Sequence, residues 1–353
     1  MELTQHEVAD RLGISRGTLH RVLSGSPLVK ASTRQRIEKA LSEIGYSPNI
    51  IAQGLRTGRT RTIGLIAIGD AKISEMEKAR AIHEAARLRG YSLVLTYSDG
   101  SAEGEARCVD ELRSRKVDGL IVTGKGRLQD SAHFKKLIKA RVGLVAIAPI
   151  ATLETDCVVV DAPWAYGEMT RHIISKGHRD IGLLLEDIQS TYAIAKEKGV
   201  ADALAAAGLP VNKDWMLRVP VRVRREEADK VRSVSDYRMG YDGALKFFAM
   251  SRRPTAVICQ SDQTAIGFQH AAKLNNVDVP GEVALTGYDD IPAAEFARVP
   301  LTTMRQPEAE LGVRAVELLM RRMEGDWSGF PQMVVLRPTL IERESCSRPK
   351  SET

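Results

Sequence analysis

Residues 15–24 combine the side chains and the helical spacing that a protein surface needs in order to contact DNA. If Leu19, Val22 and Leu23 face inward on a helix, the opposite face carries cationic and polar side chains and no acid: Arg16, Thr18, His20, Arg21 and Ser24. An Arg side chain matches the O6 and N7 acceptors of guanine in the major groove, and the free N–H groups at a helix N-terminus bind phosphate. A helix that is only solvated would more often mix acids into this face, so the pattern favours DNA recognition.

The same segment also matches a short sequence motif that is known from hydrolases. Gly13-Ile14-Ser15-Arg16-Gly17 matches the Gly-x-Ser-x-Gly sequence of hydrolase nucleophile elbows. That chemistry requires a strand before the serine, which holds the side chain at a strained turn. A capped helix precedes Ser15 instead, so we interpret Ser15 as a helix cap that also donates to a phosphate.

Three short helices are predicted to position this face. Thr4 and Glu7 have the spacing of a capping box, so the first helix begins after Thr4, and Gly13 ends it. Ser15 is placed to cap a second helix, and a further capping-box spacing at Ser32 predicts the start of a third. Their apolar stripes are Val8, Ala9 and Leu12, then Leu19, Val22 and Leu23, then Ile37, Ala40, Leu41 and Ile44. Three such helices, the first two joined by a short turn, are typical of a helix-turn-helix domain.

The positive charge of the chain is concentrated in the segment that contains these helices. The chain has 51 Lys or Arg and 45 Asp or Glu, a net charge of +6. Residues 1–61 hold ten of the basic and five of the acidic side chains, which leaves only +1 for residues 62–353. A cationic segment attached to a nearly neutral body indicates a polyanionic partner at one end of the protein.

The composition fits a globular protein of two or three folding units. The chain has 353 residues, of which 43% are hydrophobic and 27% are charged. It has no uncharged apolar stretch of about 18 residues, and its polar start lacks the apolar region of a signal peptide. The four cysteines form no Cys-x-x-Cys pair, which favours free thiols in a reducing cytoplasm. We therefore expect a cytoplasmic protein with no membrane association, no metal ion and no cofactor.

The chain resembles the lactose-repressor (LacI) family of bacterial transcription regulators. The residues that carry the resemblance in the first 68 positions are Val8-Ala9, Gly13-Ile14-Ser15, Arg21-Val22-Leu23, Thr33-Arg34, Ile44-Gly45-Tyr46, Pro48-Asn49, Leu55-Arg56 and Ile63-Gly64-Leu65-Ile66. Further matches are Val117-Asp118-Gly119-Leu120-Ile121, Lys176-Gly177-His178-Arg179-Asp180-Ile181-Gly182, Arg253-Pro254-Thr255-Ala256-Val257, Gly287-Tyr288-Asp289-Asp290 and Leu301-Thr302-Thr303. The combination of many spacings makes the resemblance specific.

The resemblance implies a DNA-binding role for particular side chains. It implies a homodimer whose two helix-turn-helix domains contact successive half-sites of a near-palindromic operator. In this interpretation Arg16, His20 and Arg21 read bases, while phosphates are held by Thr4, Ser15, Thr18, Ser24 and Thr33.

A hinge is expected between the DNA-binding domain and the body. By composition, residues 47–61 read as a linker, whereas the resemblance implies a short helix that folds on the operator. Leu55 would then wedge between base pairs from the minor groove, and Asn49 and Ala52 would line that groove. Such a short helix is marginal in water, so its folding would be coupled to DNA binding.

The body is predicted to be an α/β structure with mostly parallel sheets. Short apolar runs alternate with amphipathic helical stretches from residue 62 onward. The resemblance adds two lobes like those of periplasmic sugar-binding proteins, with chain crossings near Asp161, Ile291 and Arg322. The expected domains are therefore a helix-turn-helix domain over 1–46, a hinge over 47–61, an effector-binding and dimerisation body over 62–345 and a tail over 346–353. Lobe one would comprise about 62–160 and 292–322, and lobe two about 161–291 and 323–345.

Candidate effector residues follow the predicted strands, because ligands of open α/β sheets bind outside the carboxyl ends of the strands. Ser261 follows one strand and Asp289 another. The resemblance assigns Asp289 to hydroxyl binding, places Ser261 where some members have Asn, and places Lys196 where the family has a ligand-binding Arg. Lys lacks the planar fork of Arg, which weakens bidentate recognition.

Other candidate effector residues leave two interpretations open. Lys72 follows the first strand, and Lys125 and Arg127 follow another, so they are either solvated loop charges or ligands of an anionic effector such as a sugar acid or sugar phosphate. Trp164 either stacks on a ligand or packs near a chain crossing.

Three functions are compatible with parts of the sequence. A binding protein for carbohydrate uptake would share the two lobes but would need a signal peptide and no N-terminal helical domain. An enzyme on this fold would need a catalytic pair, a metal-ligand set or a nucleotide fingerprint, none of which the sequence offers. We therefore expect no enzymatic activity and predict a sequence-specific DNA-binding repressor that is controlled by a carbohydrate-related small molecule bound between the lobes. Induction and co-repression are both compatible with the sequence.

Overall fold

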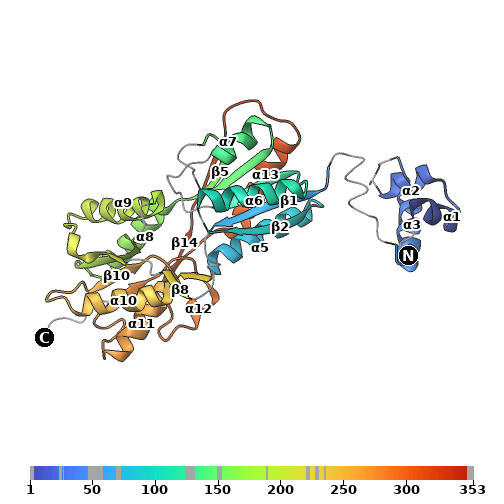
Figure 1. Cartoon of the computed structure of the whole chain (residues 1–353). Helices are drawn as coiled ribbons and strands as arrows, with labels where there is room; N and C mark the ends of the chain where they lie inside the picture. The colour runs from blue at the N-terminus through green and yellow to red at the C-terminus, as the bar shows by residue number, and fades with distance from the viewer. Residues whose placement is uncertain are drawn as a thin grey trace. The chain divides into compact units, whose positions relative to one another are not determined.

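The computed structural model comprises two compact units, Met1–Arg61 and Thr62–Thr353, which we call the N-terminal unit and the body (Figure 1). The residues that the structure describes are 4–23, 26, 28–46, 59–68, 73–99, 101–123, 132–148, 153–187, 190–219, 223–226, 230–233 and 236–347.

The N-terminal unit is built from three helices, α1 (Gln5–Arg11), α2 (Arg16–Leu23) and α3 (Ala31–Glu43). Their predicted apolar stripes meet in one small core, whose fully buried members are Val8, Ala9, Leu19, Val22, Ile37 and Leu41. The capping box at the start of α1 is confirmed, because the Glu7 N–H donates to Thr4 Oγ1 and the Thr4 N–H donates to Glu7 Oε2. The predicted cap of α2 is also present, since Ser15 Oγ accepts from the Thr18 N–H at 3.0 Å.

The predicted capping box at the start of α3 is wrong. The helix begins at Ala31 after Lys30, and Lys30 makes no side-chain capping bond. The Arg34 N–H already bonds the Lys30 carbonyl, which places Ser32 inside the first turn rather than before it. The Arg34 guanidinium donates to the Ser26 carbonyl at 2.6 Å, so this side chain ties the segment after α2 to the start of α3.

Lobe one of the body contains a parallel six-stranded sheet in the order β13-β5-β4-β3-β1-β2. Its strands are β1 (Thr62–Ile68), β2 (Ser92–Ser98), β3 (Gly119–Thr123), β4 (Gly143–Ile147), β5 (Asp156–Val160) and β13 (Met333–Leu336). Helices α5 (Ile73–Leu88) and α13 (Glu308–Met323) pack on one face through a core that includes Ile63, Leu65 and Leu319. Helices α6 (Ala102–Ser114) and α7 (Ala132–Lys139) cover the other face. Helices thus bury both faces of this sheet, and the central strands β3 and β4 are buried along their whole length, as is expected of a parallel sheet between helices.

Lobe two contains a parallel four-stranded sheet in the order β11-β10-β6-β7. Its strands are β6 (Ile181–Glu186), β7 (Met216–Val219), β10 (Ala256–Cys259) and β11 (Ala284–Thr286). Helices α8 (Ala162–Ser175) and α9 (Thr191–Ala206) pack on one face, and α10 (Asp236–Phe248) and α11 (Asp262–Leu274) on the other. Two glycines let α10 and α11 approach closely, because a Cβ at Gly240 would lie 1.9 Å from the Thr264 carbonyl oxygen and one at Gly267 equally close to that of Tyr237.

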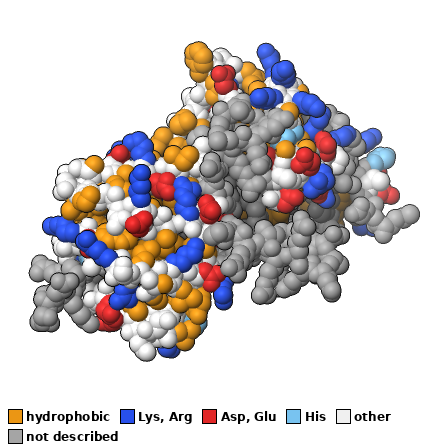
Figure 2. Space-filling model, turned by 60° about the vertical axis from the view of Figure 1, so that its left-hand side comes forward, with side chains coloured by type: hydrophobic (Ala, Val, Ile, Leu, Met, Phe, Trp, Pro, Cys, Tyr) orange, Lys and Arg blue, Asp and Glu red, His pale blue; other side chains and the backbone are white. Residues whose placement is uncertain are grey.

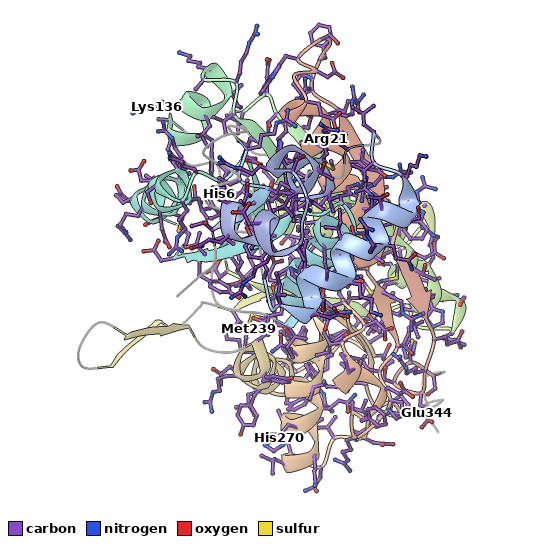
Figure 3. The ribbon with its side chains drawn as sticks, turned by 90° about the vertical axis from the view of Figure 1, so that its right-hand side faces the viewer. His6, Arg21, Lys136, Met239, His270 and Glu344 are labelled. Carbon is purple, nitrogen blue, oxygen red and sulfur yellow. The ribbon has the colours of Figure 1, made fainter. Side chains whose placement is uncertain are left out.

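Smaller elements complete lobe two. They are the 3₁₀ helix η1 (Lys213–Trp215), α12 (Pro292–Glu295), the antiparallel pair of β12 (Thr303–Arg305) and β14 (Thr339–Ile341), and the antiparallel hairpin of β8 (Val223–Glu226) and β9 (Lys230–Ser233). The β8–β9 hairpin projects from the body (Figure 3).

Two chain crossings between the lobes lie later in the sequence than the expected positions near Ile291 and Arg322. Ile291 and Leu301 are buried in the core of lobe two, so the second crossing follows β12, at residues 306–307. β13 pairs with β5 of lobe one, and β14 then pairs with β12, so the third crossing lies at residues 337–338. Residues 292–305 therefore belong to lobe two, and residues 323–336 to lobe one.

The surface of the body mixes both signs of charge. On the face in view in Figure 2, acidic and basic side chains are interspersed with apolar ones. This agrees with the balance of 41 basic and 40 acidic residues after residue 61. No helix in the described part of the chain is long and apolar enough to cross a membrane.

Candidate DNA-binding and effector sites

The outward face of α2 combines two arginines with polar side chains. Leu19 and Val22 are buried against α1 and α3, which turns Arg16 and Arg21 outward, and both are exposed. The first turn of α2 contains no acid. Figure 3 shows Arg21 on α2. A Cβ at Gly17 would lie 3.6 Å from Arg21 Nη2, so the guanidinium extends back along the helix over Gly17. Arg16 is the first residue of α2, whereas Arg21 lies in its last turn and directs its guanidinium back toward Gly17.

The predicted phosphate ligands differ in how their hydroxyls are used. Ser15 Oγ caps α2 and hydrogen-bonds Thr18 Oγ1 at 2.8 Å, so the two hydroxyls form a connected pair at the helix start. The Thr4 hydroxyl donates to Glu7 Oε2 at 2.8 Å, so a phosphate would compete with Glu7 for this donor. His20 and Thr33 are half-buried on α2 and α3.

Lys196 lies in lobe two against two tyrosine rings. Its Nζ lies 5.2 Å from the centroid of the Tyr166 ring and 5.4 Å from that of Tyr288, and it donates to the Gln260 carbonyl at 3.3 Å. The Tyr166 hydroxyl donates to the same carbonyl at 3.0 Å. Burial raises the pKa values of both tyrosines well above the ordinary value, so both rings stay neutral under the ammonium. This arrangement fixes the position of Lys196 at the carboxyl end of β10.

Asp289 lies next to the second chain crossing. Its Oδ1 accepts from Gln306 Nε2 at 2.5 Å, and its backbone φ of 115° is in a region that non-glycine residues rarely adopt. Strained backbone of this kind is common at ligand sites. The neighbouring Asp290 is bound by Arg305 and Arg343, which leaves Asp289 as the carboxylate of this turn that faces lobe one.

Ser261 has a structural role at the start of α11. Its Oγ accepts from the Thr264 N–H at 3.2 Å and donates to Asp236 Oδ2 at 3.1 Å. The side chain is buried, and it lies at the carboxyl end of β10, as the sequence predicts. A ligand at this position would therefore meet a hydroxyl that is already oriented by the helix cap.

Two residues that the sequence analysis missed bring lobe one to the same region. Lys78 of α5 is bound to Glu75 Oε1 at 2.8 Å and faces Tyr192 and Asp289 of lobe two. Burial alone would lower the pKa of Lys78, but the negative charges of Glu75 and Asp289 raise it above the ordinary value. Glu308, the first residue of α13, has a pKa raised to about 7 by burial and by Asp289.

A sequence signal for Lys78 existed. It lies four residues before the buried Ile82 on the side of α5 that packs against the sheet, where an apolar residue is expected. Burying an unpaired ammonium is costly, so a lysine on the buried side of a helix predicts an acidic partner nearby.

Two family models match the chain. The model for bacterial regulatory proteins of the lacI family matches residues 4–49, which contain α1, α2 and α3. The model for the periplasmic binding protein-like domain matches residues 170–346, which is half of the chain. The chain belongs to the lacI family of bacterial regulatory proteins.

This lacI-family protein is similar to curated regulators over most of its length. Catabolite control protein A of Priestia megaterium is 29% identical over 325 residues, which cover 92% of this chain and 93% of the relative. The ribose operon repressor of Haemophilus influenzae is 27% identical over 345 residues, with coverage of 97% and 98%. The HTH-type transcriptional repressor PurR of Pasteurella multocida is 29% identical over 343 residues, again with coverage of 97% and 98%.

Solved structures show the same architecture. The complex of the transcriptional regulator CelR with cellobiose has a TM-score of 0.70 and 25% identity, and covers 98% of this chain and 100% of that chain. The Lac repressor dimer bound to operator and the anti-inducer ONPF has a TM-score of 0.78 with the same coverage, and at 22% identity it supports the fold alone. The lacI-family protein described here is therefore a DNA-binding transcription regulator whose α/β body resembles periplasmic binding proteins.

Trp164 packs near the first chain crossing in this lacI-family protein. The backbone N–H of Trp164 donates to Asp161 Oδ1 at 3.0 Å, and the indole ring lies 5.5 Å from the Arg337 guanidinium. Its ring also packs against the core of lobe two. These contacts favour the packing interpretation of Trp164 over ligand stacking.

Several predicted residues lie outside the part of the chain that the structure describes. They are Ser24, Asn49, Ala52 and Leu55 of the DNA contact, and Lys72, Lys125 and Arg127 of the proposed anion site.

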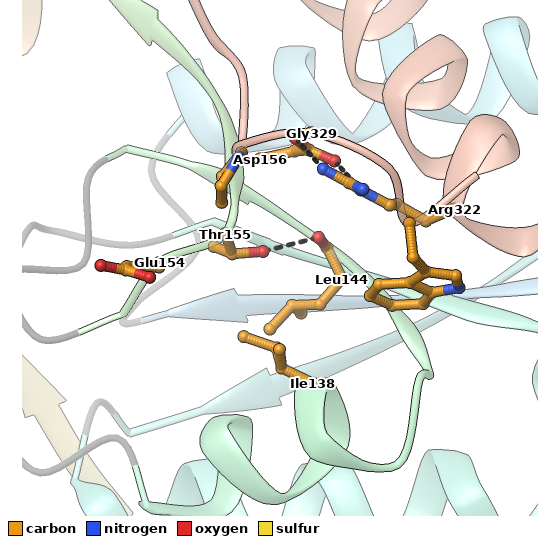
Figure 4. A pocket seen from close by; sticks show the side chains of 9 residues that line it. Ile138, Leu144, Glu154, Thr155, Asp156, Arg322 and Gly329 are labelled. Atoms are coloured by element: carbon orange, nitrogen blue, oxygen red, sulfur yellow. Dashed lines mark hydrogen bonds and ion pairs between the residues drawn. The ribbon is translucent and has the colours of Figure 1, made fainter. Parts of the chain in front are cut away.

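A cavity of about 110 Å³ lies in lobe one, at the amino ends of β4 and β5 (Figure 4). Its lining includes Leu144, Thr155, Asp156, Arg322 and Trp327. None of the predicted effector residues lines it. Ser261 and Asp289 lie instead after the carboxyl ends of β10 and β11, and Lys196 lies on α9.

Proposed function

We propose that this protein represses transcription by binding an operator through the exposed face of α2 and responds to a small molecule bound between its lobes. The observation that carries the DNA-binding part is the acid-free face of α2, on which Arg16 and Arg21 are exposed while Leu19 and Val22 are buried. Because the protein acts on DNA of the chromosome, we place it in the cytoplasm.

The DNA contact that we propose is that of a homodimer. Arg16, His20 and Arg21 read base edges, and the hydroxyls at the start of α2 and on α3 bind phosphates. Leu55 of each hinge enters the minor groove between the two half-sites. The Lac repressor, a structural relative, forms a dimer on its operator, which supports this arrangement.

The effector site that we propose is formed by Lys196, Ser261 and Asp289, with Trp164 at its border. These residues lie at the carboxyl ends of β10 and β11 or on helices beside them. A sugar or a sugar derivative is the favoured class of effector, because CelR is solved with cellobiose and another relative is a ribose operon repressor. Effector binding would rotate one lobe against the other and so change the separation of the hinges.

The DNA-binding part is tested with the full-length protein and sheared DNA of its own genome. Fragments retained by the protein at moderate ionic strength are sequenced, and we expect enrichment of fragments that share a near-palindromic site. The double variant Arg16→Ala/Arg21→Ala should lose the enrichment, whereas Lys39→Ala, an exposed change on α3, should keep it. Retention of all fragments in proportion to their abundance would contradict the proposal.

A further inference from the structure

The edge strand β13 of lobe one exposes apolar side chains. Val334 and Leu336 pack into the core that this sheet forms with α5 and α13. Met333 and Val335 alternate onto the opposite face of the sheet, where they are 58% and 53% exposed. Phe330, in the segment that leads into β13, is 94% exposed. No residue of β13 is charged, although natural edge strands are usually protected by charged side chains or by a covering element. This grouping of apolar side chains at an unprotected edge indicates an interaction site.

The cavity in lobe one lies between this edge and α7 (Figure 4). Pro331 lines it from the segment that leads into β13, and Ile138 lines it from α7. Arg322 and Asp156 also line it, but they are bound to each other, and the Trp327 ring lies beside the guanidinium. A cavity of about 150 Å³ accommodates benzene. At about 110 Å³, this one has room for an aliphatic side chain of a partner.

Helix α7 borders the cavity with cations. Its exposed basic side chains, together with one in the turn that follows, are Lys135, Lys136, Lys139 and Arg141 (Figure 3 shows Lys136). No acid occurs between residues 131 and 153, and within the described residues none of these four cations forms an ion pair. Lys135 and Lys139 are one turn apart and both lie next to Ile138, on the side of α7 that borders the cavity. Against the four cations, the cavity lining contributes one exposed acid, Glu154.

Several other outer helices of the body pair their exposed cations with acids three or four residues away. The pairs include Arg80–Glu77 on α5, Arg171–Glu168 on α8 and Lys198–Asp202 on α9. On α7, by contrast, Lys135 and Lys139 place like charges one turn apart, which slightly destabilises a helix. A partner that brings carboxylates to α7 would remove this repulsion.

The three features of this surface select among classes of partner. DNA would neutralise the cations but would leave the exposed apolar side chains and the cavity without a partner. A second copy of the chain in a two-fold contact would bring the cations of one α7 toward those of the other. An anionic membrane would contact both the cations and the apolar side chains, but a planar surface does not fill a cavity. A protein segment with carboxylates and a protruding apolar side chain matches all three.

We propose that lobe one binds an acidic segment of another protein on the α7–β13 surface, which comprises the cavity, the four cations, Phe330, Met333 and Val335. One apolar side chain of the segment fills the cavity, others cover the edge at β13, and its carboxylates pair with the lysines. The surface lies at the amino ends of β4 and β5, whereas Ser261 and Asp289 follow the carboxyl ends of β10 and β11. The partner and the effector therefore occupy separate sites on the body.

The test selects peptides on the full-length protein. Random peptides of about 15 residues, the length of about four helical turns, are displayed on phage and selected on the immobilised protein. We expect the enriched peptides to be acidic and to carry large apolar residues. Fluorescence anisotropy of a labelled synthetic copy measures the affinity, which should fall as salt is added because charge pairs contribute to binding.

One pair of matched variants tests the cations. Lys135→Gln/Lys139→Gln should weaken peptide binding about tenfold and reduce its dependence on salt. Lys246→Gln/Lys273→Gln removes two exposed cations from α10 and α11 of lobe two and should leave the affinity unchanged. All four side chains are exposed, so both variants should keep the thermal stability of the unchanged protein.

A second pair tests the apolar side chains. Phe330→Ser/Met333→Ser should also weaken binding about tenfold, because these side chains are covered by the peptide. Leu95→Ser/Tyr97→Ser changes exposed apolar residues of β2, the opposite edge strand, and should bind the peptide like the unchanged protein.

Four results would overturn the inference. They are the absence of any enriched peptide, enrichment of basic or neutral peptides, equal losses in the test and control variants, and binding by another class of partner in place of peptides. For the last result, vesicles of phosphatidylglycerol and random-sequence DNA are tested with Lys135→Gln/Lys139→Gln. Loss of vesicle or DNA binding in this variant, with no peptide selected, would assign the surface to lipid or nucleic acid. The genomic DNA enrichment experiment tests the proposed regulator function separately.

Discussion

The Arg322 guanidinium of α13 is bound by the Asp156 carboxylate of β5 through two hydrogen bonds, of 2.6 and 3.0 Å (Figure 4). The two side chains are only 10% and 3% exposed. Asp156 also accepts from the Gln332 N–H at 2.7 Å, and the Trp327 ring lies 5.4 Å from the guanidinium. The pair thus connects α13, β5 and the segment that leads into β13.

Replacing Arg322 should destabilise the body strongly. Arg322→Ala leaves the buried Asp156 carboxylate without its cation, which should lower the free energy of unfolding by about 3–5 kcal/mol. Denaturant unfolding followed by circular dichroism measures the change. Arg321→Ala is the control, because its pair with Asp326 is about half exposed and should contribute less than about 1 kcal/mol. Equal effects of the two variants would refute a structural role for the buried pair.

Arg21→Ala should weaken and relax operator recognition. Loss of a base-reading guanidinium costs about 1–3 kcal/mol and reduces discrimination at one base pair of each half-site. Gel-shift titrations with the selected operator and single-base variants measure both effects. Lys39→Ala, on an exposed position of α3, should leave the base preference intact. Unchanged discrimination in Arg21→Ala would remove the assigned role.

Leu55→Ala should reduce the bend of the operator. An apolar side chain wedged between base pairs unstacks them, and alanine is too small to maintain this contact. The bend angle is measured by energy transfer between dyes at the two ends of the operator. A bend equal to that of the unchanged protein would show that Leu55 is not the wedge.

Lys196→Ala should abolish the response to effector while effector-free operator binding persists. The ammonium lies in lobe two, and the N-terminal unit has its own core, so the two activities are separable. Operator binding is titrated with and without candidate sugars and sugar derivatives. Lys198→Ala serves as the control on the same helix. A normal effector response in Lys196→Ala would exclude this residue from the site.

Glu308 should make stability depend on pH near neutrality. Its pKa of about 7 in the folded body lies above the ordinary value of 4.5. The folded state therefore binds more protons between these values, and the free energy of unfolding should fall as pH rises from about 4.5 through 7. Denaturant unfolding at a series of pH values measures this slope. Glu308→Gln should reduce the slope, whereas Glu310→Gln, which is about half exposed on the same helix, should not. An identical slope in both variants would contradict the assignment.

The sequence by itself determined the three helices of the N-terminal unit, apart from the start of α3. Helix caps and apolar stripes are set within about one turn of the residues that form them, so Thr4, Ser15 and the stripe of Leu19 and Val22 were predictable. The start of α3 is the exception. A backbone bond from Arg34 to Lys30 and the contact of Arg34 with Ser26 place that start, and the capping-box spacing at Ser32 did not indicate either.

Only the tertiary structure decided where the chain crosses between the lobes and which charges meet there. Strands that are far apart in the sequence pair with each other, so no local pattern could show that β13 pairs with β5 or that β12 pairs with β14. Lys78 and Asp289 are more than two hundred residues apart and interact because α5 of lobe one and the turn after β11 of lobe two meet at the lobe boundary. Contacts between charged side chains of different lobes depend on how the whole lobes pack, whereas hydrophobic periodicity and helix caps depend only on residues that are near each other in the sequence.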